Sequence, residues 1–200
     1  MNELRKQRMK SVLKYTWPFY LIVGFVIFLA MGIIFRIVHP IPAYKTLTIF
    51  VTGQVTNREK LFEDMYQRFD DKEIRKFSCI EASPNDVHYA TKLTVSGYKS
   101  ADVLIIPTSK VDTIENLGTF ALNISDELVS GDYSNFAFYE RDNTKYGVKI
   151  DKDKVSQYMT LPEEDCYMFL NGASKNIGKY GLKPVIEHDM ALLLVKDWGM

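Results

Sequence analysis

An uncharged apolar segment close to the N-terminus constrains this chain more than any other feature of its sequence. Residues 17–35 carry no formal charge over 19 positions. A helix of about 20 residues spans the roughly 30 Å hydrocarbon core of a bilayer, so this segment is long enough to cross one. Trp17 opens the segment, and aromatic residues of this kind are typical of membrane interfaces. We therefore predict one transmembrane helix over residues 15–38, in contact with the lipid bilayer.

The distribution of basic residues predicts the orientation of this helix. Five Lys and Arg residues precede it against one acidic residue, Glu3, whereas residues 37–44 contain no Lys or Arg. Because basic flanking residues stay in the cytoplasm, we predict a cytoplasmic basic tail over residues 1–14. A linker with two prolines over residues 39–45 would then join a single extracytoplasmic domain, residues 46–200, to the cell membrane.

A cleaved signal peptide is the alternative interpretation of the same segment. The apolar part of a signal peptide is roughly 7–15 residues long and is followed by small residues at the cleavage site. Ile41, Pro42 and Ala43 form a poor cleavage site because of the proline, and no cysteine directly follows that could carry a lipid. The length of the segment and its flanking charges favour an uncleaved anchor.

Charge and cysteine content limit the partners of the outer domain. The chain has 25 basic and 25 acidic residues, but the first 43 residues hold six of the basic and only one of the acidic ones. The remainder therefore carries a formal net charge of −5, which argues against nucleic acid as a partner. Cys79 and Cys166 are far apart in the sequence, and both a disulfide and two free thiols are compatible with this spacing.

Three continuous apolar runs predict the core of the outer domain. They cover residues 47–51, 77–82 and 101–106. Continuous rather than alternating runs suit strands that are covered on both faces. Each run is followed by a helix-start signal, so the strand–helix repeat predicts an α/β fold with right-handed crossovers. We expect three layers around a parallel-rich sheet, with the strand order 2-1-3 extended by C-terminal strands.

The helix-start signals are local pairs of capping residues. Thr56 with Glu59 predicts a capping box, Ser83 precedes a proline, and Thr108 with Ser109 can cap a third helix. Later in the chain the signal is weaker. Residues 146–150 and 166–171 are typical of strands, residues 171–183 of a loop, and residues 189–196 of a closing helix.

The order of these elements resembles a known family. Residues 47–69 form an apolar run, a Thr-Gly-Gln turn and an amphipathic segment, and residues 101–107 form a run closed by a proline. These resemble the opening and the third strand of extracellular solute-binding proteins of transport systems, the type 2 periplasmic-binding-protein-like family. Residues 120–124 and 167–198 resemble its following segment and its C-terminal return strand, loop and helix. The family has two lobes, about twice this length and a lipid-attached cysteine, so the resemblance implies a reduced, one-lobe, membrane-anchored relative.

Polar residues follow each predicted strand at the edge where ligands of parallel sheets bind. We predict a ligand-binding site formed by Thr52, Gly53, Gln54, Thr56, Asn57, Ser83, Asn85, Thr108 and Ser109. Their hydroxyl, amide and N–H groups suit a sugar hydroxyl or an anion, although the same residue types also simply cap helices. The expected ligand is a small solute, a saccharide or peptide, for a transport or sensing system. The alternative is an interaction protein that keeps the fold without a ligand and docks on a membrane transport or envelope protein.

Catalytic and metal-binding patterns are incomplete in this sequence. Ser96 and Lys99 match the Ser-x-x-Lys motif of penicillin-interacting enzymes, but the partner motifs Ser-Asp-Asn and Lys-Thr-Gly do not occur. His39, His88 and His188 are scattered without metal-ligand spacing. We therefore expect a non-enzymatic protein without metal or cofactor.

The orientation of the anchor leads to a direct prediction. A protease added to intact cells should digest residues 46–200 and leave a cytoplasmic control protein whole, because the bilayer shields only the interior. An immunoblot against the C-terminal domain measures this. A domain that survives while a known surface protein is digested would contradict the predicted topology.

Overall fold

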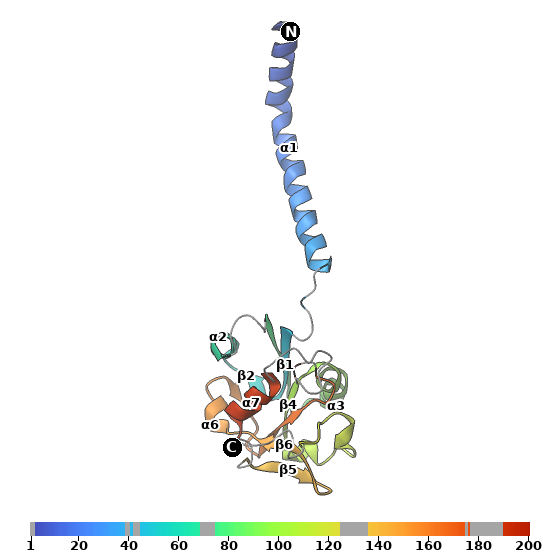
Figure 1. Cartoon of the computed structure of the whole chain (residues 1–200), viewed down its shortest axis with the longest axis vertical. Coiled ribbons are helices and arrows are strands. Elements are labelled where there is room, and N and C mark those ends of the chain that lie inside the picture. The colour runs from blue at the N-terminus through green and yellow to red at the C-terminus, as the bar shows by residue number, and fades with distance from the viewer. Residues whose placement is uncertain are drawn as a thin grey trace. The chain divides into compact units, whose positions relative to one another are not determined.

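The computed structural model describes residues 3–38, 41, 45–68, 75–124, 136–174, 176 and 190–200. The chain divides into two compact units, Met1–Pro40 and Ile41–Met200. The described part of the first unit is a single helix, α1 (Glu3–Val38), drawn in blue in Figure 1. It begins well before the predicted span, so the helix also includes most of the basic tail.

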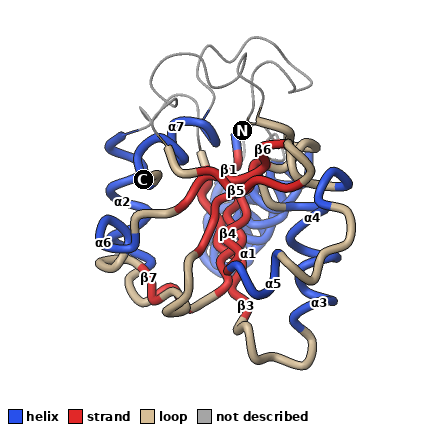
Figure 2. The backbone as a smooth tube through the Cα atoms, turned by 90° about the horizontal axis from the view of Figure 1, so that it is seen from below, coloured by secondary structure: helices blue, strands red, loops and turns tan. Residues whose placement is uncertain are grey.

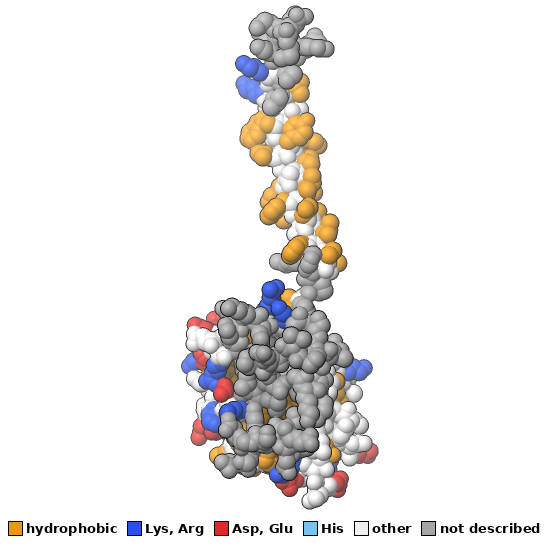
Figure 3. Space-filling model, in the orientation of Figure 1, with side chains coloured by type: hydrophobic (Ala, Val, Ile, Leu, Met, Phe, Trp, Pro, Cys, Tyr) orange, Lys and Arg blue, Asp and Glu red, His pale blue; other side chains and the backbone are white. Residues whose placement is uncertain are grey.

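Helix α1 is exposed and apolar. The stretch Lys14–Phe35 covers 22 residues with a mean hydropathy of 2.5, and none of its most apolar part is buried in the protein. Figure 3 shows its hydrophobic side chains along the length of the helix. By length and composition the helix can cross a membrane, which fits either a membrane anchor or a signal sequence.

The second unit is an α/β domain built on a six-stranded mixed sheet in the order β3-β1-β4-β8-β6-β5 (Figure 1). Its strands are β1 (Thr46–Thr52), β3 (Lys76–Ala82), β4 (Val103–Pro107), β5 (Phe138–Arg141), β6 (Thr144–Lys149) and β8 (Cys166–Leu170). Strand β1 pairs in parallel with both β3 and β4, which confirms the predicted order of the first three strands. A separate two-stranded sheet joins β2 (Gln54–Val55) to β7 (Met159–Thr160).

The other half of the sheet differs from the prediction. The pairs β4–β8, β8–β6 and β6–β5 are all antiparallel, so the sheet is mixed rather than parallel-rich. Strands β5 and β6 form a hairpin around Asp142 and Asn143, whose φ angles of 52° and 60° are positive. Two successive residues in this conformation are typical of tight hairpin turns, and such a turn makes the pairing antiparallel. Residues 146–150 and 166–171 are strands as predicted, whereas β5 was not expected from the sequence.

Helices cover both faces of the large sheet (Figure 2). Helices α2 (Arg58–Arg68), α6 (Lys152–Val155) and α7 (Met190–Trp198) lie on one side. The other side holds α3 (Tyr89–Lys92), a π-turn (Leu93–Gly97), α4 (Tyr98–Ser100) and α5 (Thr108–Val111). A short 3₁₀ turn, Leu117–Thr119, contributes Leu117 to the core on this second side.

Successive residues of the central strands point into two different hydrophobic cores. Ile49 of β1 and Val103 of β4 are buried with α2 and α7 in one core, whereas Phe50 and Leu104 are buried in the other. This alternation follows from the two-residue period of a strand, and it explains why residues 49–51 and 103–106 are apolar at every position.

Of the three predicted helix starts, the first and third lie close to where they were expected but lack the predicted caps, and the second is wrong. Asn57, not Thr56, caps α2: Asn57 Oδ1 accepts the Lys60 N–H at 3.1 Å, whereas the Thr56 hydroxyl donates to the carbonyl of Tyr158 at 3.1 Å. The helix expected at Ser83 begins at Tyr89, after turns over residues 83–88.

The third helix, α5, begins at Thr108 but ends at Val111 and has no side-chain cap. Instead, Thr108 donates its hydroxyl hydrogen bond to the carbonyl of Asp165 at 2.9 Å. A bond to a segment far away in the sequence therefore replaces the predicted local cap.

The two cysteines are free thiols. Cys79 lies on β3 and Cys166 on β8, and strands β1 and β4 separate them in the sheet. Three strand spacings of about 4.8 Å place their backbones roughly 14 Å apart, beyond the reach of a disulfide. Burial raises the pKa of both thiols to about 11, so neither is poised as a nucleophile.

The turn after β1 depends on a glycine. Gly53 has a φ of 152°, and a Cβ at this position would lie 2.3 Å from the carbonyl oxygen of Thr160. We predict that Gly53→Ala lowers the free energy of unfolding by about 2 kcal/mol or more, through backbone strain and this clash. Thermal unfolding should show a midpoint lower by several degrees. Gly172→Ala is the control, because its Cβ would meet no atom closer than 3.7 Å; equal losses from both changes would contradict the account.

Candidate functional site

The predicted ligand residues lie where the parallel strands end, and several of their polar groups, such as the hydroxyls of Thr52, Thr108 and Ser109, are hydrogen-bonded within the domain. The Thr52 hydroxyl is buried and shares a 2.8 Å hydrogen bond with the hydroxyl of Tyr89. The Gly53 N–H donates to the carbonyl of Ala82 at 3.0 Å, so the ends of β1 and β3 are joined directly. Ser83 and Asn85 lie in the following turn, where the Asn85 N–H donates to Ser83 Oγ at 3.4 Å.

Residues 158–165 form hydrogen bonds with several of the other predicted ligand residues at this edge. Gln54 pairs with Thr160 between β2 and β7, and Thr56 bonds to Tyr158 as described above. The side chain of Glu164 accepts both the N–H of Ser109, at 2.8 Å, and its hydroxyl hydrogen, at 2.6 Å. The acidic run after Pro162 is the sequence feature that could have indicated this partner. Ligand binding at this edge stays a prediction.

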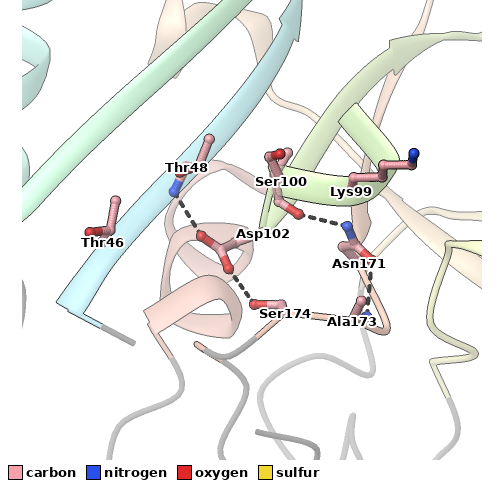
Figure 4. A pocket seen from close by; sticks show the side chains of 9 residues that line it. Thr46, Thr48, Lys99, Ser100, Asp102, Asn171, Ala173 and Ser174 are labelled. Carbon is pink, nitrogen blue, oxygen red and sulfur yellow. Dashed lines mark hydrogen bonds between the residues drawn. The ribbon is translucent and has the colours of Figure 1, made fainter. Parts of the chain in front are cut away.

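A polar pocket lies at the opposite edge of the sheet, at the amino ends of β1 and β4 (Figure 4). Its volume is about 330 Å³, near the lower limit of about 300 Å³ for small-molecule sites. Three segments line it: Thr46 and Thr48 from β1, the α4–β4 connection, and the chain that follows β8. None of the nine predicted residues belongs to this lining.

Asp102 is the buried acid of this pocket. Only 6% of the residue is exposed, and its carboxylate accepts the N–H of Thr48 at 2.7 Å and the hydroxyl hydrogen of Ser174 at 2.5 Å. The N–H of Asp102 donates in turn to the carbonyl of Thr48 at 2.7 Å. Its side chain thus continues the hydrogen bonding between β1 and β4 beyond the end of the ladder. Burial raises the pKa of Asp102, and the hydrogen bonds from Ser174 and Thr48 oppose that rise.

Two buried asparagines position the chain that follows β8. Asn171 donates from Nδ2 to the carbonyls of Tyr98 at 2.8 Å and Ala101 at 2.7 Å. Asn176 donates from Nδ2 to the carbonyl of Thr46 at 2.8 Å. These contacts hold the wall of the pocket against the start of β1. The Oδ1 atom of Asn176 is buried and accepts no hydrogen bond from the residues that the structure describes.

The remaining polar side chains of the pocket lining form no hydrogen bond or ion pair with the residues that the structure describes. Within the described residues, no hydrogen bond or ion pair engages the ammonium group of Lys99 or the hydroxyls of Thr46, Thr48 and Ser100. Figure 4 shows Asp102 between Thr48 and Ser174, with Lys99 and Ser100 on the α4 side. The pocket therefore combines a fixed carboxylate with one ammonium and three hydroxyl groups that are available to a ligand.

The sequence contained one signal for this pocket. Asp102 is the single charged residue inside an apolar run, residues 101–106, and a buried charge requires dedicated partners. Those partners, Ser174 and the backbone of Thr48, lie far away in the sequence, so the pocket itself could not be assembled from local patterns.

No protein-family model, curated protein or solved structure matches this chain. Among the described residues, no group of three or more His, Cys, Asp or Glu side chains could hold a metal ion. The fold and the site define an α/β domain with a polar pocket, preceded by an apolar helix long enough to cross a membrane.

The raised pKa of Asp102 predicts a pH dependence. The folded state holds the proton more tightly than the unfolded state, where the pKa is near 3.8. The contribution of Asp102 to stability is therefore fully present below that value and is lost as the pH rises through the folded-state pKa. Between about pH 4 and pH 7, the thermal midpoint of the wild type should fall relative to that of Asp102→Asn, which cannot ionise. Asp142→Asn, at an exposed turn, is the control. A midpoint difference that stays constant across this range would contradict the assignment.

Proposed function

We propose that this chain is a single-pass membrane protein whose extracytoplasmic α/β domain binds a small solute, a saccharide or peptide, without catalysing a reaction. One observation carries the proposal: an exposed apolar helix precedes a separately packed domain that has a polar pocket of ligand size. The N-terminus is cytoplasmic in this proposal, because the basic residues precede the helix.

Burial in lipid gives α1 the apolar surroundings that it lacks within the chain. Phe28 is 75% exposed and Phe35 is 66% exposed, and most apolar side chains between them are more than half exposed. Removing one such side chain from water contributes about 1.5–3 kcal/mol. Monomeric soluble proteins rarely expose a continuous apolar surface of this length. We propose that residues 15–38 form an uncleaved anchor and that residues 39–45 are the linker, because the apolar segment is longer than that of a signal peptide.

The arrangement of the sheet supports the proposed relation to solute-binding proteins. The parallel order β3-β1-β4 is the order predicted from the strand–helix repeat, and strand β8, the proposed return strand, lies directly beside β4. One compact unit, Ile41–Met200, provides one lobe. A one-lobe relative cannot close two lobes around its ligand, so we expect weak binding for a transport or sensing system.

The edge of the sheet at the carboxyl ends of the parallel strands supports a second candidate function. There, Thr56, Thr108 and Ser109 are bonded to residues 158–165 rather than left open to a ligand. A domain that has kept the fold without a ligand would instead dock on a membrane transport or envelope protein.

Thermal unfolding of the full-length protein in lipid nanodiscs distinguishes the two candidates. A solute at 100 times its dissociation constant should stabilise the folded domain by about 2.7 kcal/mol and raise the midpoint by several degrees. A saturable rise with one class among saccharides, peptides and amino acids is the expected result. A well-folded protein whose midpoint no compound raises would contradict solute binding and favour the docking function.

A further inference from the structure

We propose that the solute site is the polar pocket at the amino ends of β1 and β4, and that its ligand is a small zwitterion of amino-acid size. This inference rests on the proposed solute-binding function, but it names an amino acid rather than a saccharide or peptide as the solute. It also places the site at the edge opposite to the one expected from the sequence. The ligand would carry an ammonium group for Asp102 and a carboxylate for Lys99.

The size of the pocket limits the ligand. A volume of about 330 Å³ is close to the lower limit of about 300 Å³ for small-molecule sites, so a long peptide does not fit. The lining also contains no aromatic side chain among the described residues, which leaves no face on which a sugar ring could stack. A compact polar molecule fits these limits best.

The pocket lining contains two charged side chains of opposite sign, Asp102 and Lys99, which form no ion pair with each other. Asp102 accepts two hydrogen bonds, from Thr48 and Ser174, whereas a carboxylate offers about four acceptor positions. The side-chain amide of Asn176 also acts on this carboxyl and lowers its pKa, so at least one position remains for an N–H group of a ligand ammonium. Lys99 forms no ion pair in the described structure, and its ammonium group can donate to a ligand carboxylate. No cation among the described residues pairs with Asp102; a buried carboxylate in this state is unfavourable, and a cationic ligand group would relieve that cost.

Uncharged groups complete the recognition of a small polar ligand. The hydroxyls of Thr46, Thr48 and Ser100 can each donate or accept. Close by, the amide of Asn176 contacts the carbonyl of Thr46, and its buried Oδ1 accepts no bond from the described residues. Buried acceptors without a donor are rare in folded proteins, so this atom marks a position where a further donor is expected.

Titration of the full-length protein in nanodiscs with defined probes tests both parts of the inference. The probes are serine and alanine, together with ethanolamine, which has only the ammonium group, propionate, which has only the carboxylate, and glucose, which has neither. We expect saturable binding of the amino acids by calorimetry, and binding at least about ten-fold weaker for the single-charge probes.

Variants locate the site. Lys99→Gln and Asp102→Asn should each weaken amino-acid binding at least about ten-fold. Lys60→Gln and Asp142→Asn make the same chemical changes at exposed positions away from the pocket and should leave binding unchanged. Lys99 is exposed and has no described partner, so its substitution tests the pocket even if Asp102→Asn does not fold.

The outcomes separate this inference from the function on which it rests. Amino-acid binding that is unaffected by Lys99→Gln and by a folded Asp102→Asn would overturn the pocket, while solute binding by the domain would stand. Binding of glucose that these variants abolish would overturn the ligand class. A wild-type protein that binds none of the probes, and whose midpoint no compound of the wider panel raises, would overturn this site and the solute-binding function together.

Discussion

The pairing of β1 with two parallel neighbours is the constraint on which the rest of the domain depends. Strand β1 forms ladders with β3 on one side and β4 on the other, and its successive side chains enter both hydrophobic cores. Both helical layers therefore pack against this strand. At its amino end the ladder is continued by Asp102, whose side chain and backbone both bond to Thr48. Because the middle of β1 is buried on both faces, polar groups of this strand can reach a ligand only at its two ends.

The two ends of β1 differ in how many of the nearby polar groups are already hydrogen-bonded within the domain. At the carboxyl end, residues 158–165 lie across the loops and accept their hydrogen bonds, with Glu164 bonded twice to Ser109. At the amino end, buried groups such as Asn171 and Ser174 form a fixed wall, and the more exposed Lys99 remains available. A rigid wall with free groups beside it is the arrangement expected of a small-ligand site, because the binding geometry is prepared in advance.

The sequence predicted the strands that are buried on both faces. It did not predict the features that depend on hydrogen bonds between residues far apart in the chain. Residues 49–51 and 103–106 are apolar at every position because both faces are covered, so their parallel order was predictable. The caps at Thr56 and Thr108 failed because the carbonyls of residues 158 and 165 compete successfully for their hydroxyls, and no local pattern reveals such partners. The hairpin at Asp142, which pairs β5 with β6, was missed although Asp and Asn tolerate positive φ.

Hydrogen exchange of the full-length protein in nanodiscs tests whether the ligand lies at the amino ends of β1 and β4. Backbone amide exchange would be recorded by mass spectrometry with and without a saturating amino acid. A ligand in the pocket should slow amide exchange in residues 45–48 and 99–102, because it would stabilise the amino ends of β1 and β4. Slower exchange confined to residues 52–57 and 108–109, with no change at the amino ends, would contradict it and place the ligand at the edge first expected from the sequence.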